Sequence, residues 1–199
     1  MNNFYDENTD LDWYEFDKPE DLENYAEVKS SVNGWKSEGI SKFILDETGI
    51  LDDFMSVFLP DFIVGNSKHA HCYCYYVLDK NKKPLGITNI STNDESENVA
   101  YIEYLIVNPK NTGKGIGTRM IKSIISNPEF FAKTKKVFHW ELSVDDRNEP
   151  SKRAVLKNNF RVYSKPKNPD TTYVGTLSTY YWAKPRKLPN NSNSEMENN

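Results

Sequence analysis

The sequence predicts an α+β domain with a central mixed sheet, mostly antiparallel, that helices flank. Two observations carry this prediction. Short segments rich in β-branched and aromatic residues follow one another over 71–107, with polar turns between them, as in an antiparallel meander. A strand, a glycine loop, a helix and a further strand then occupy 101–144. This order defines a βαβ unit, whose right-handed crossover makes its two strands parallel.

The chain of 199 residues is long enough for one domain with a sizeable core. We expect that domain to cover 1–187. Residues 1–16 are acidic and aromatic, and we expect either a mobile extension or a segment that packs through Trp13, Tyr14 and Phe16. Residues 188–199 contain five asparagines and little apolar surface, which is typical of a disordered tail.

Several elements are expected before the central strand. A first helix begins at Pro19, because proline followed by acidic residues is favourable in a first helical turn. A second helix covers 49–58, with its apolar residues on one side. The meander has strands over 71–78 and 84–90, a polar turn at 79–83 and a solvated loop at 92–98, and it leads into the central strand at 101–107.

A glycine loop separates the central strand from the next helix. Asn108 and Pro109 end the strand, because proline cannot donate to a sheet ladder and asparagine favours turns. Gly113, Gly115 and Gly117 allow tight bends and bring backbone N–H groups close to a ligand. From residue 118 onward, apolar residues follow helical spacing. The free N–H groups and the dipole of such a helix start favour a phosphate.

Two better-known phosphate loops are excluded by their spacing. A Walker loop has four residues between its first glycine and Gly-Lys-Ser/Thr. Here Lys114 already follows the first glycine, Gly113, and no lysine stands between Gly117 and Thr118. The dinucleotide fingerprint GxGxxG would need a third glycine where this chain has Thr118.

The loop instead resembles motif A of the GNAT superfamily, the acyl-CoA-dependent N-acetyltransferases. That motif is a V-x-P turn, a few residues, and then Arg/Gln-x-x-Gly-x-Gly/Ala. The matching residues are Val107, Pro109, Gly115 and Gly117. Thr112 stands where arginine or glutamine is usual, which weakens the clamp on the pyrophosphate but leaves the backbone donors intact. An ordinary turn between a strand and a helix is the alternative.

A second resemblance follows the strand expected over 137–144. In motif B of the same family, an asparagine after the strand begins a helix that ends in Gly-Phe, and Asn148 to Phe160 keep that register. Asn159 replaces the glycine, and asparagine tolerates the left-handed geometry of such a helix end. Val155 replaces the tyrosine that serves many members as general acid. A closing hairpin over 161–165 and 171–183 is expected after this helix.

The resemblance implies a V-shaped split between the strands at 101–107 and 137–144, which takes the pantetheine arm of acetyl-CoA. Backbone N–H groups of the first strand would polarise the thioester carbonyl, and the glycine loop would hold the pyrophosphate. Asn148 is equally suited to cap a helix. The implied acetyl-CoA-binding residues are Leu105, Ile106, Val107, Thr112, Gly113, Lys114, Gly115, Ile116, Gly117, Thr118, Asn148 and Ser151.

Glu103 is the candidate catalytic base. An amine must lose its ammonium proton before it attacks a thioester. Many relatives have a glutamate four residues before the motif valine, which is the position of Glu103. Since a carboxylate in an apolar strand is costly unless paired or hydrated, we expect Glu103 to face the split, where a water could relay the proton. The alternatives are a carboxylate without a catalytic role, and a base at Glu141 with Ser143.

Charge is unevenly distributed along the chain. Residues 1–60 carry 15 acidic and 4 basic side chains, a net charge of −11, and the remainder carries +7. The acidic part could attract a cationic acceptor, and the basic remainder suits a polyanionic cofactor, to which Lys114 and Arg119 would contribute. A merely solvated charged surface is the alternative.

The cysteines and histidines do not point to a metal. Cys72 and Cys74 form a CxC pattern that puts both thiols on one strand face without a second pair for zinc, so we expect reduced thiols. His69 and His71 could ligate a metal, but a polar strand edge is the simpler interpretation. No signal peptide or membrane span is recognisable, so we expect a cytoplasmic protein without a membrane partner.

The sequence therefore predicts an N-acetyltransferase that moves an acetyl group from acetyl-CoA to a primary amine by direct attack. The CoA thiolate would leave unaided, take a proton from water, or use Tyr163 or Tyr104. The alternative class is a degenerate GNAT domain that binds CoA as a sensor or interaction module, which Thr112 and Val155 keep open. A nucleic-acid partner is disfavoured, because the basic residues are dispersed and the net charge is −4. The acceptor, a cationic small molecule or peptide, and the choice between monomer and homodimer stay open.

Overall fold

The structure is a computed structural model that describes residues 3–16, 72–93, 96–134, 136–137, 139–146, 148–164 and 177–183. The helices expected from Pro19 and over 49–58 lie outside the described residues, as do His69, His71 and the tail at 188–199.

Eight strands, three helices and one 3-10 turn make up the described part of the chain. The strands are β1 (Asn3–Asp6), β2 (Leu11–Phe16), β3 (Cys72–Leu78), β4 (Pro84–Asn93), β5 (Ser96–Val107), β6 (His139–Asp145), β7 (Arg161–Ser164) and β8 (Leu177–Ala183), and the other elements are η5 (Pro109–Asn111), α4 (Ile116–Ser126), α5 (Pro128–Phe131) and α6 (Glu149–Lys157).

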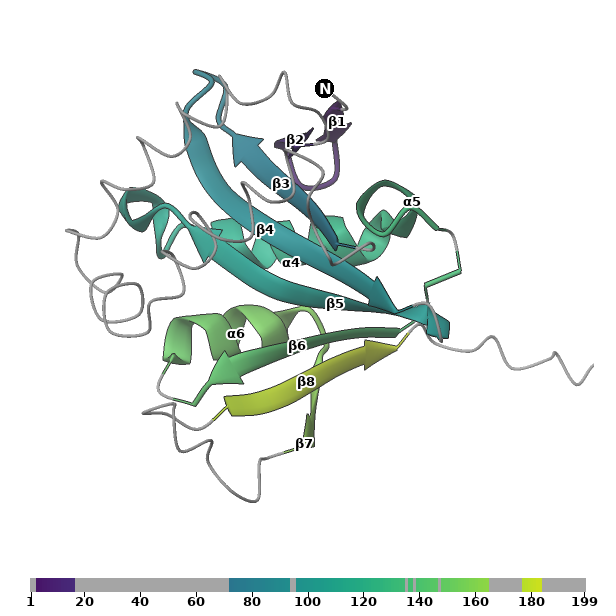
Figure 1. The fold of residues 1–199 in the computed structure, drawn as a ribbon. Coiled ribbons are helices and arrows are strands. Elements are labelled where there is room, and N and C mark those ends of the chain that lie inside the picture. Colours follow the sequence, from purple (N-terminus) through teal and green to yellow (C-terminus); the bar gives the residue numbers. More distant parts are fainter. Residues whose placement is uncertain are drawn as a thin grey trace, which may run out of the picture.

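All eight strands belong to one sheet, in the order β1-β2-β3-β4-β5-β6-β8-β7 (Figure 1). Every neighbouring pair is antiparallel except β5 and β6, which are parallel. The βαβ unit expected from the sequence is therefore β5-α4-β6. The prediction of a mixed, mostly antiparallel sheet is confirmed.

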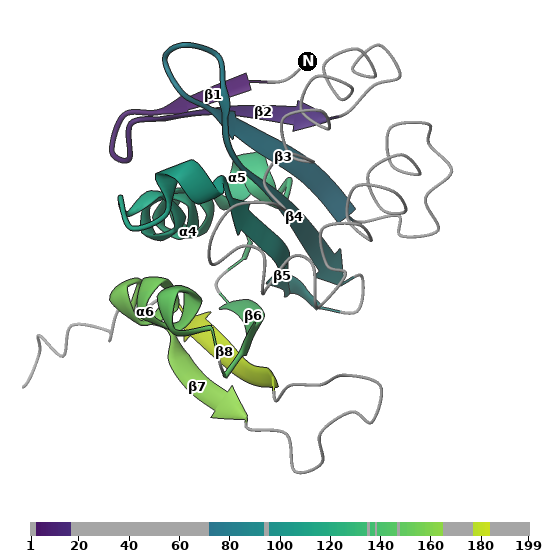
Figure 2. The same ribbon diagram turned by 90° about the vertical axis from the view of Figure 1, so that its left-hand side faces the viewer.

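The core lies between the sheet and the two longer helices, α4 and α6, which both cover the same face (Figure 2). α4 presents Met120, Ile121 and Ile124 to the strands, and all three side chains are buried. On β6, Trp140, Leu142 and Val144 point into the same core with the period-2 alternation expected of a strand. The opposite face of the sheet carries polar residues, among them Ser91 and Glu103.

Residues 3–16 form the hairpin β1–β2, which extends the sheet beyond β3. Trp13 is fully buried, and its indole N–H donates a 3.0 Å hydrogen bond to the hydroxyl of Ser123 on α4. The guanidinium of Arg119 donates to the carbonyl of Thr9 at 2.8 Å. This segment is thus fixed to α4 by burial and by hydrogen bonds from Trp13 and Arg119.

The prediction of a solvated loop over 92–98 is wrong. β4 continues to Asn93 and β5 begins at Ser96, and Thr92 pairs with Ala100. The side chains of this stretch are polar, but a backbone ladder does not depend on side-chain polarity. The meander therefore has longer strands than the residue types indicate.

The end of α6 follows the sequence prediction. Asn159 has a φ of +64°, the left-handed conformation that glycine normally supplies at this position. The expected closing hairpin is present as β7 and β8, with β8 lying between β6 and β7. Among the helices that the structure describes, none has the length and apolarity to cross a membrane.

Candidate active site

The parallel strands β5 and β6 separate partway along their length. They pair at only three rungs, and the last of these joins Tyr101 to Glu141. β5 then runs on to Val107 and β6 to Asp145, and the two diverge toward their C-terminal ends (Figure 1). Within the described residues, the edge of β5 beyond Tyr101 that faces β6 has no strand partner, so its backbone groups are left for a ligand. The expected splayed strand pair is confirmed.

A β-bulge lies where β5 leaves β6. On β4, Asn89 pairs with Tyr104, but the next residue, Ile90, pairs with Ile102. Glu103 is therefore the extra residue of a bulge. Bulges bend the strand that carries them and increase its twist. We attribute the divergence of β5 from β6 to this bulge, which follows their last rung by two residues.

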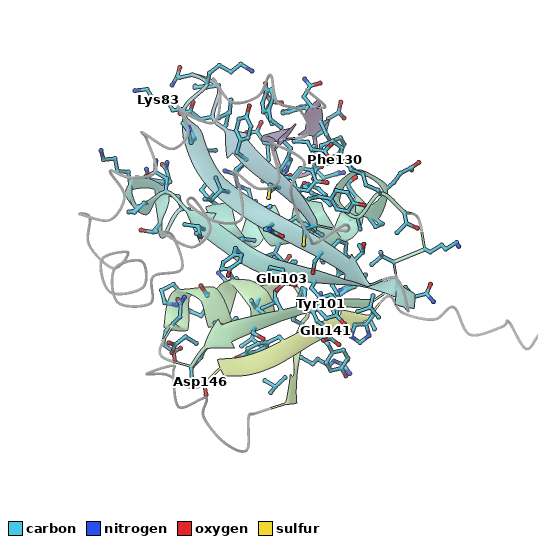
Figure 3. The ribbon with its side chains drawn as sticks, in the orientation of Figure 1. Lys83, Tyr101, Glu103, Phe130, Glu141 and Asp146 are labelled. Atoms are coloured by element: carbon cyan, nitrogen blue, oxygen red, sulfur yellow. The ribbon has the colours of Figure 1, made fainter. Side chains whose placement is uncertain are left out.

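The bulge turns the Glu103 side chain outward. Glu103 is exposed, and Ser91 on β4 donates a 2.5 Å hydrogen bond from Oγ to its Oε1. Ile102, the preceding residue, is buried in the core under α4 and α6, whereas Glu103 lies with Ser91 on the opposite face of the sheet. Figure 3 places Glu103 beside Tyr101 and Glu141, around the point where the strands part. Ser91 is a neighbour that sequence reasoning missed, because the bulge register that joins it to Glu103 has no local sequence signal.

A second titratable group lies on the other side of Tyr101. The imidazole Nε2 of His139 is 2.9 Å from Oε1 of Glu141, and the His139 ring stacks on Tyr181 with centroids 5.7 Å apart. Burial raises the pKa of the Tyr101 phenol, and the carboxylates of Glu141 and Glu103 raise it further. Tyr101 thus stays a neutral phenol between two carboxylates. Glu141 is engaged by His139, whereas Ser91 gives Glu103 a neutral partner.

The two cysteines are on this same face, beside Glu103. Burial, with a smaller effect of Glu103, raises the pKa of Cys72 to about 11, and burial also raises the pKa of Cys74. Both cysteines are free thiols, as the sequence predicts, and a protonated thiol is a poor nucleophile. Among the described residues, no three His, Cys, Asp or Glu side chains gather in a way that could hold a metal ion.

The glycine loop leaves open space above its backbone. Gly113 and Gly115 both have a φ of +77°, in the left-handed region that favours glycine. A Cβ atom built on either residue would meet no atom within 4 Å. Gly115 is the N-cap of α4 and supplies no capping side chain. The loop is therefore bare backbone in front of an uncapped helix.

Hydrogen-bond donors of this loop remain available. In the part of the chain that the structure describes, no backbone carbonyl accepts from the N–H groups of Gly113, Gly115, Ile116, Gly117 and Thr118. Lys114 stays at the loop, where its Nζ donates to Oδ1 of Asn111 at 3.0 Å. Arg119 does not contribute its charge here, since it binds the β1–β2 turn.

The third glycine has a different role from the first two. A Cβ on Gly117 would contact the side chain of Val107 at 3.4 Å and that of Leu105 at 3.9 Å. The missing side chain lets the first turn of α4 pack closely against β5. The loop is thereby held at the open end of the strand pair, next to the three β5 residues that the resemblance assigns to the pantetheine arm, Leu105, Ile106 and Val107.

α6 begins at the far side of the split. The side chain of Asn148 accepts a 3.1 Å hydrogen bond from the backbone N–H of Ser151, so Asn148 is a helix cap. The side-chain amide of Asn158, near the end of α6, donates to the carbonyl of Thr118 on α4 at 3.0 Å. Val155 is only 2 % exposed and belongs to the core. The position of the usual tyrosine acid is therefore apolar and buried in this chain.

Comparison with known proteins agrees with this geometry. The family model of the Acetyltransferase (GNAT) family matches residues 44–160. No curated protein sequence matches the chain.

Solved structures with a similar fold are acetyltransferases. An acetyl transferase from Salmonella typhimurium that modifies the N-terminal serine of ribosomal protein L7/L12 is 12 % identical, with 87 % of this chain and 94 % of that chain covered and a TM-score of 0.58. Campylobacter jejuni N-acetyltransferase PseH, in complex with acetyl coenzyme A, is 13 % identical, with coverages of 88 % and 99 % and a TM-score of 0.56. A chimera of Vibrio cholerae spermidine N-acetyltransferase SpeG and hSSAT is 13 % identical, with coverages of 67 % and 76 % and a TM-score of 0.52. At these identities the likeness establishes the fold.

Proposed function

Because the chain belongs to the GNAT family of acetyltransferases, we propose that it transfers an acetyl group from acetyl-CoA directly to a primary amine, with Glu103 as general base. The observation that carries the proposal is the bare, uncapped glycine loop at the open end of the β5–β6 split. Acetyl-CoA would supply the activated acetyl group and a thiolate leaving group. The residues of this chain bind it, orient it and move the proton.

The glycine loop fits the pyrophosphate of acetyl-CoA. Within the described residues, the backbone N–H groups of Gly113 and of Gly115 to Thr118 have no backbone partner, and they and the positive end of the α4 dipole favour a dianionic group. The open space above Gly113 and Gly115 lets phosphate oxygens approach the backbone. Lys114 adds a positive charge beside the loop. Thr112, in place of arginine or glutamine, contributes no charge to this clamp.

The open edge of β5 fits the pantetheine arm, which carries amide groups. Backbone groups of Leu105, Ile106 and Val107 on that edge would bond these amides and orient the thioester carbonyl toward an N–H donor. At the start of α6, the side-chain oxygen Oδ1 of Asn148 already accepts from the Ser151 N–H. The Nδ2 donors of Asn148 and the Ser151 hydroxyl would therefore contact the cofactor.

Glu103 is placed to take the ammonium proton of the acceptor. It is exposed, lies on the sheet face opposite α4 and α6, and follows the last rung of the strand pair by two residues. The Ser91 hydrogen bond fixes one of its oxygens and leaves the other for an amine or a water. Glu141 is the less favoured base because its partner is the His139 imidazole, which forms an ion pair with it when protonated, whereas the partner of Glu103 is a neutral hydroxyl.

Direct transfer is favoured over an acyl-cysteine route. The two thiols on the face of Glu103 have raised pKa values, about 11 for Cys72. Only a small fraction of such a thiol is thiolate at neutral pH, so attack by the amine itself is the simpler path. The leaving thiolate would depart unaided or be protonated by water or a tyrosine, with Tyr104 on β5 closer to the split than Tyr163 on β7.

The acceptor is proposed to be a cationic amine. Residues 1–60 carry a net charge of −11, and Glu103 and Glu141 add carboxylates at the split. Proteins of similar fold act on spermidine and on a protein N-terminal serine, according to their names. Small polyamines and peptide amines are therefore the first acceptors to test.

A CoA-binding module without catalysis is the second candidate. The buried Val155 favours it, because the core position cannot supply a general acid. Calorimetry with acetyl-CoA, followed by a screen of amines for CoA release, separates the two functions. Binding with release supports the acetyltransferase, and binding without release for any amine supports the module. No binding of acetyl-CoA would remove both.

A further inference from the structure

A buried polar atom lies on the same sheet face as the proposed base, two residues along β4 from its partner Ser91. Asn89 on β4 is 1 % exposed, and in the part of the chain that the structure describes its side-chain oxygen Oδ1 has no hydrogen-bond partner. The side-chain nitrogen makes a weak contact, with Nδ2 donating to Sγ of Cys74 at 3.6 Å. A buried acceptor without a donor destabilises a folded protein, so its presence calls for a ligand or an ordered water.

Asn89 lies on the sheet face that carries Glu103, at the level of the bulge in β5. It pairs with Tyr104 across the bulge that projects Glu103, and it is two residues from Ser91, the partner of Glu103. Residues two apart on a strand point to the same face, at a spacing of about 7 Å. Asn89 therefore lies on the same face of the sheet as Ser91, opposite the face that α4 and α6 cover.

Acceptors of hydrogen bonds dominate this patch. The Asn89 oxygen has no donor, and the Glu103 carboxylate has one, from Ser91. Cys72 and Cys74 remain neutral thiols, which are weak donors. A ligand that satisfies this patch must bring N–H donors and positive charge. A primary ammonium brings three N–H donors on a single atom.

We propose that Asn89 is an acceptor-binding residue, whose Oδ1 receives an N–H of a primary ammonium group while Glu103 supplies the opposing charge. The proposal rests on the proposed function, which it deepens by naming a residue and the chemical class that this residue recognises on the sheet face opposite α4 and α6: a primary alkylammonium. The Asn89 oxygen is left unpaired in the free protein because its partner arrives with the acceptor.

Propylammonium chloride is a suitable probe, with tetramethylammonium chloride as a control of equal charge that has no N–H donor. The readout is the side-chain amide resonance of Asn89 in a ¹⁵N-labelled protein, assigned by its absence in Asn89→Leu. We expect propylammonium to shift this resonance saturably and tetramethylammonium to leave it unchanged. If both cations leave it unchanged, or shift it equally, the Asn89 subsite is wrong and only a water fills the position.

Two substitutions at Asn89 separate binding from structure, with propylammonium affinity measured by calorimetry. Asn89→Leu removes the orphaned oxygen at similar volume, so we expect an unchanged or higher melting temperature and at least about a tenfold loss of propylammonium affinity. Asn89→Asp keeps an oxygen acceptor and should retain binding at a lower melting temperature. Ile90→Val, the next residue, faces the helices and should lower stability without affecting the probe.

Calorimetry with acetyl-CoA on the same proteins distinguishes failure of this subsite from failure of the proposed function. Normal acetyl-CoA binding with no probe-dependent shift would overturn the Asn89 proposal alone. A probe-dependent shift without acetyl-CoA binding would overturn the proposed function and keep the ammonium subsite. Asn89→Leu that melts lower and still binds propylammonium would show a purely structural residue.

Discussion

The hydroxyl of Ser91 donates a 2.5 Å hydrogen bond to Oε1 of Glu103, across the bulge that turns β5 away from β6. This contact joins the two features on which the proposed chemistry depends. The bulge opens the split that would take the pantetheine arm, and the same extra residue carries the carboxylate that would take the proton. Ser91 orients that carboxylate without neutralising it.

Glu103→Gln should lower turnover by about 100- to 10,000-fold, because glutamine keeps the shape and cannot accept the amine proton. Acetyl-CoA affinity should be unchanged, and the loss should shrink at high pH as free amine accumulates. Steady-state kinetics against pH check this. Ser91→Ala, which only frees the carboxylate, should lose less than Glu103→Gln. Normal turnover in Glu103→Gln would move the base to Glu141.

Gly115→Val should weaken acetyl-CoA binding more than tenfold, about 1.4 kcal/mol, because it places a branched side chain where the pyrophosphate approaches. The φ of +77° at this residue adds backbone strain. Gly115→Asn is the matched control, since asparagine tolerates this conformation and isolates the effect of the side chain. Calorimetry gives both affinities. Equal affinity in wild type and Gly115→Val would remove the pyrophosphate from this loop.

Val155→Tyr should destabilise the protein by about 1–3 kcal/mol, because it inserts a phenol into a filled core position. Urea unfolding measures the change. The substitution should not raise turnover, since the position lies in the core. A stable Val155→Tyr protein with faster CoA release would mean that the side chain at 155 can reach the split and act as the missing acid.

Cys72 should react slowly with iodoacetamide at neutral pH and faster as the pH approaches its pKa of about 11. The folded state holds this proton more firmly than the ordinary thiol with a pKa of 9.0. The resulting stability contribution is fully present below pH 9.0 and is lost as the pH rises through about 11. Mass spectrometry of the modified chain, with Cys72→Ala as control, follows the rate. Rapid modification at neutral pH would indicate an activated thiol and reopen the acyl-cysteine route.

The apparent acceptor constant should rise with salt if the acidic residues within 1–60 steer a cationic amine. Attraction between exposed charges is screened beyond about 8 Å at physiological ionic strength. Kinetics with a polyamine from low to high salt measure the dependence. A flat constant would assign the acidic segment to solvation alone.

Much of the fold could be predicted because its signals are local. The glycine spacing, the apolar helix after it and the strand at 137–144 predict the βαβ unit, and the left-handed tolerance of asparagine predicts the conformation of Asn159. The strands on either side of residues 94–95 could not be predicted from residue types, because cross-strand pairing stabilises polar segments that have weak strand preference. In β2, the buried residues Leu11 and Trp13 alternate with the residues between them, as expected of a strand. So short a pattern does not predict a strand by itself, because the strand forms only by pairing with the edge of β3.

Less of the candidate site could be predicted from the sequence. Glu103 can be singled out by its distance from Val107, but its exposure follows from a bulge, and a bulge depends on the register of two strands. Ser91 and Asn89 can be related to Glu103 only once the register of β4 against β5 is known. Arg119 has the charge expected near a pyrophosphate, yet it binds the carbonyl of Thr9, a contact between residues far apart in the sequence.

The most direct test of the central claim is CoA release from acetyl-CoA by the wild-type protein with polyamines and peptide amines, followed by mass spectrometry of the amine product. The account predicts CoA release that depends on the amine, one acetyl group added to the amine nitrogen, and no acetyl group left on Cys72. Acetyl-CoA binding without release for every amine, or an acetylated Cys72 that forms before the product, would contradict direct transfer.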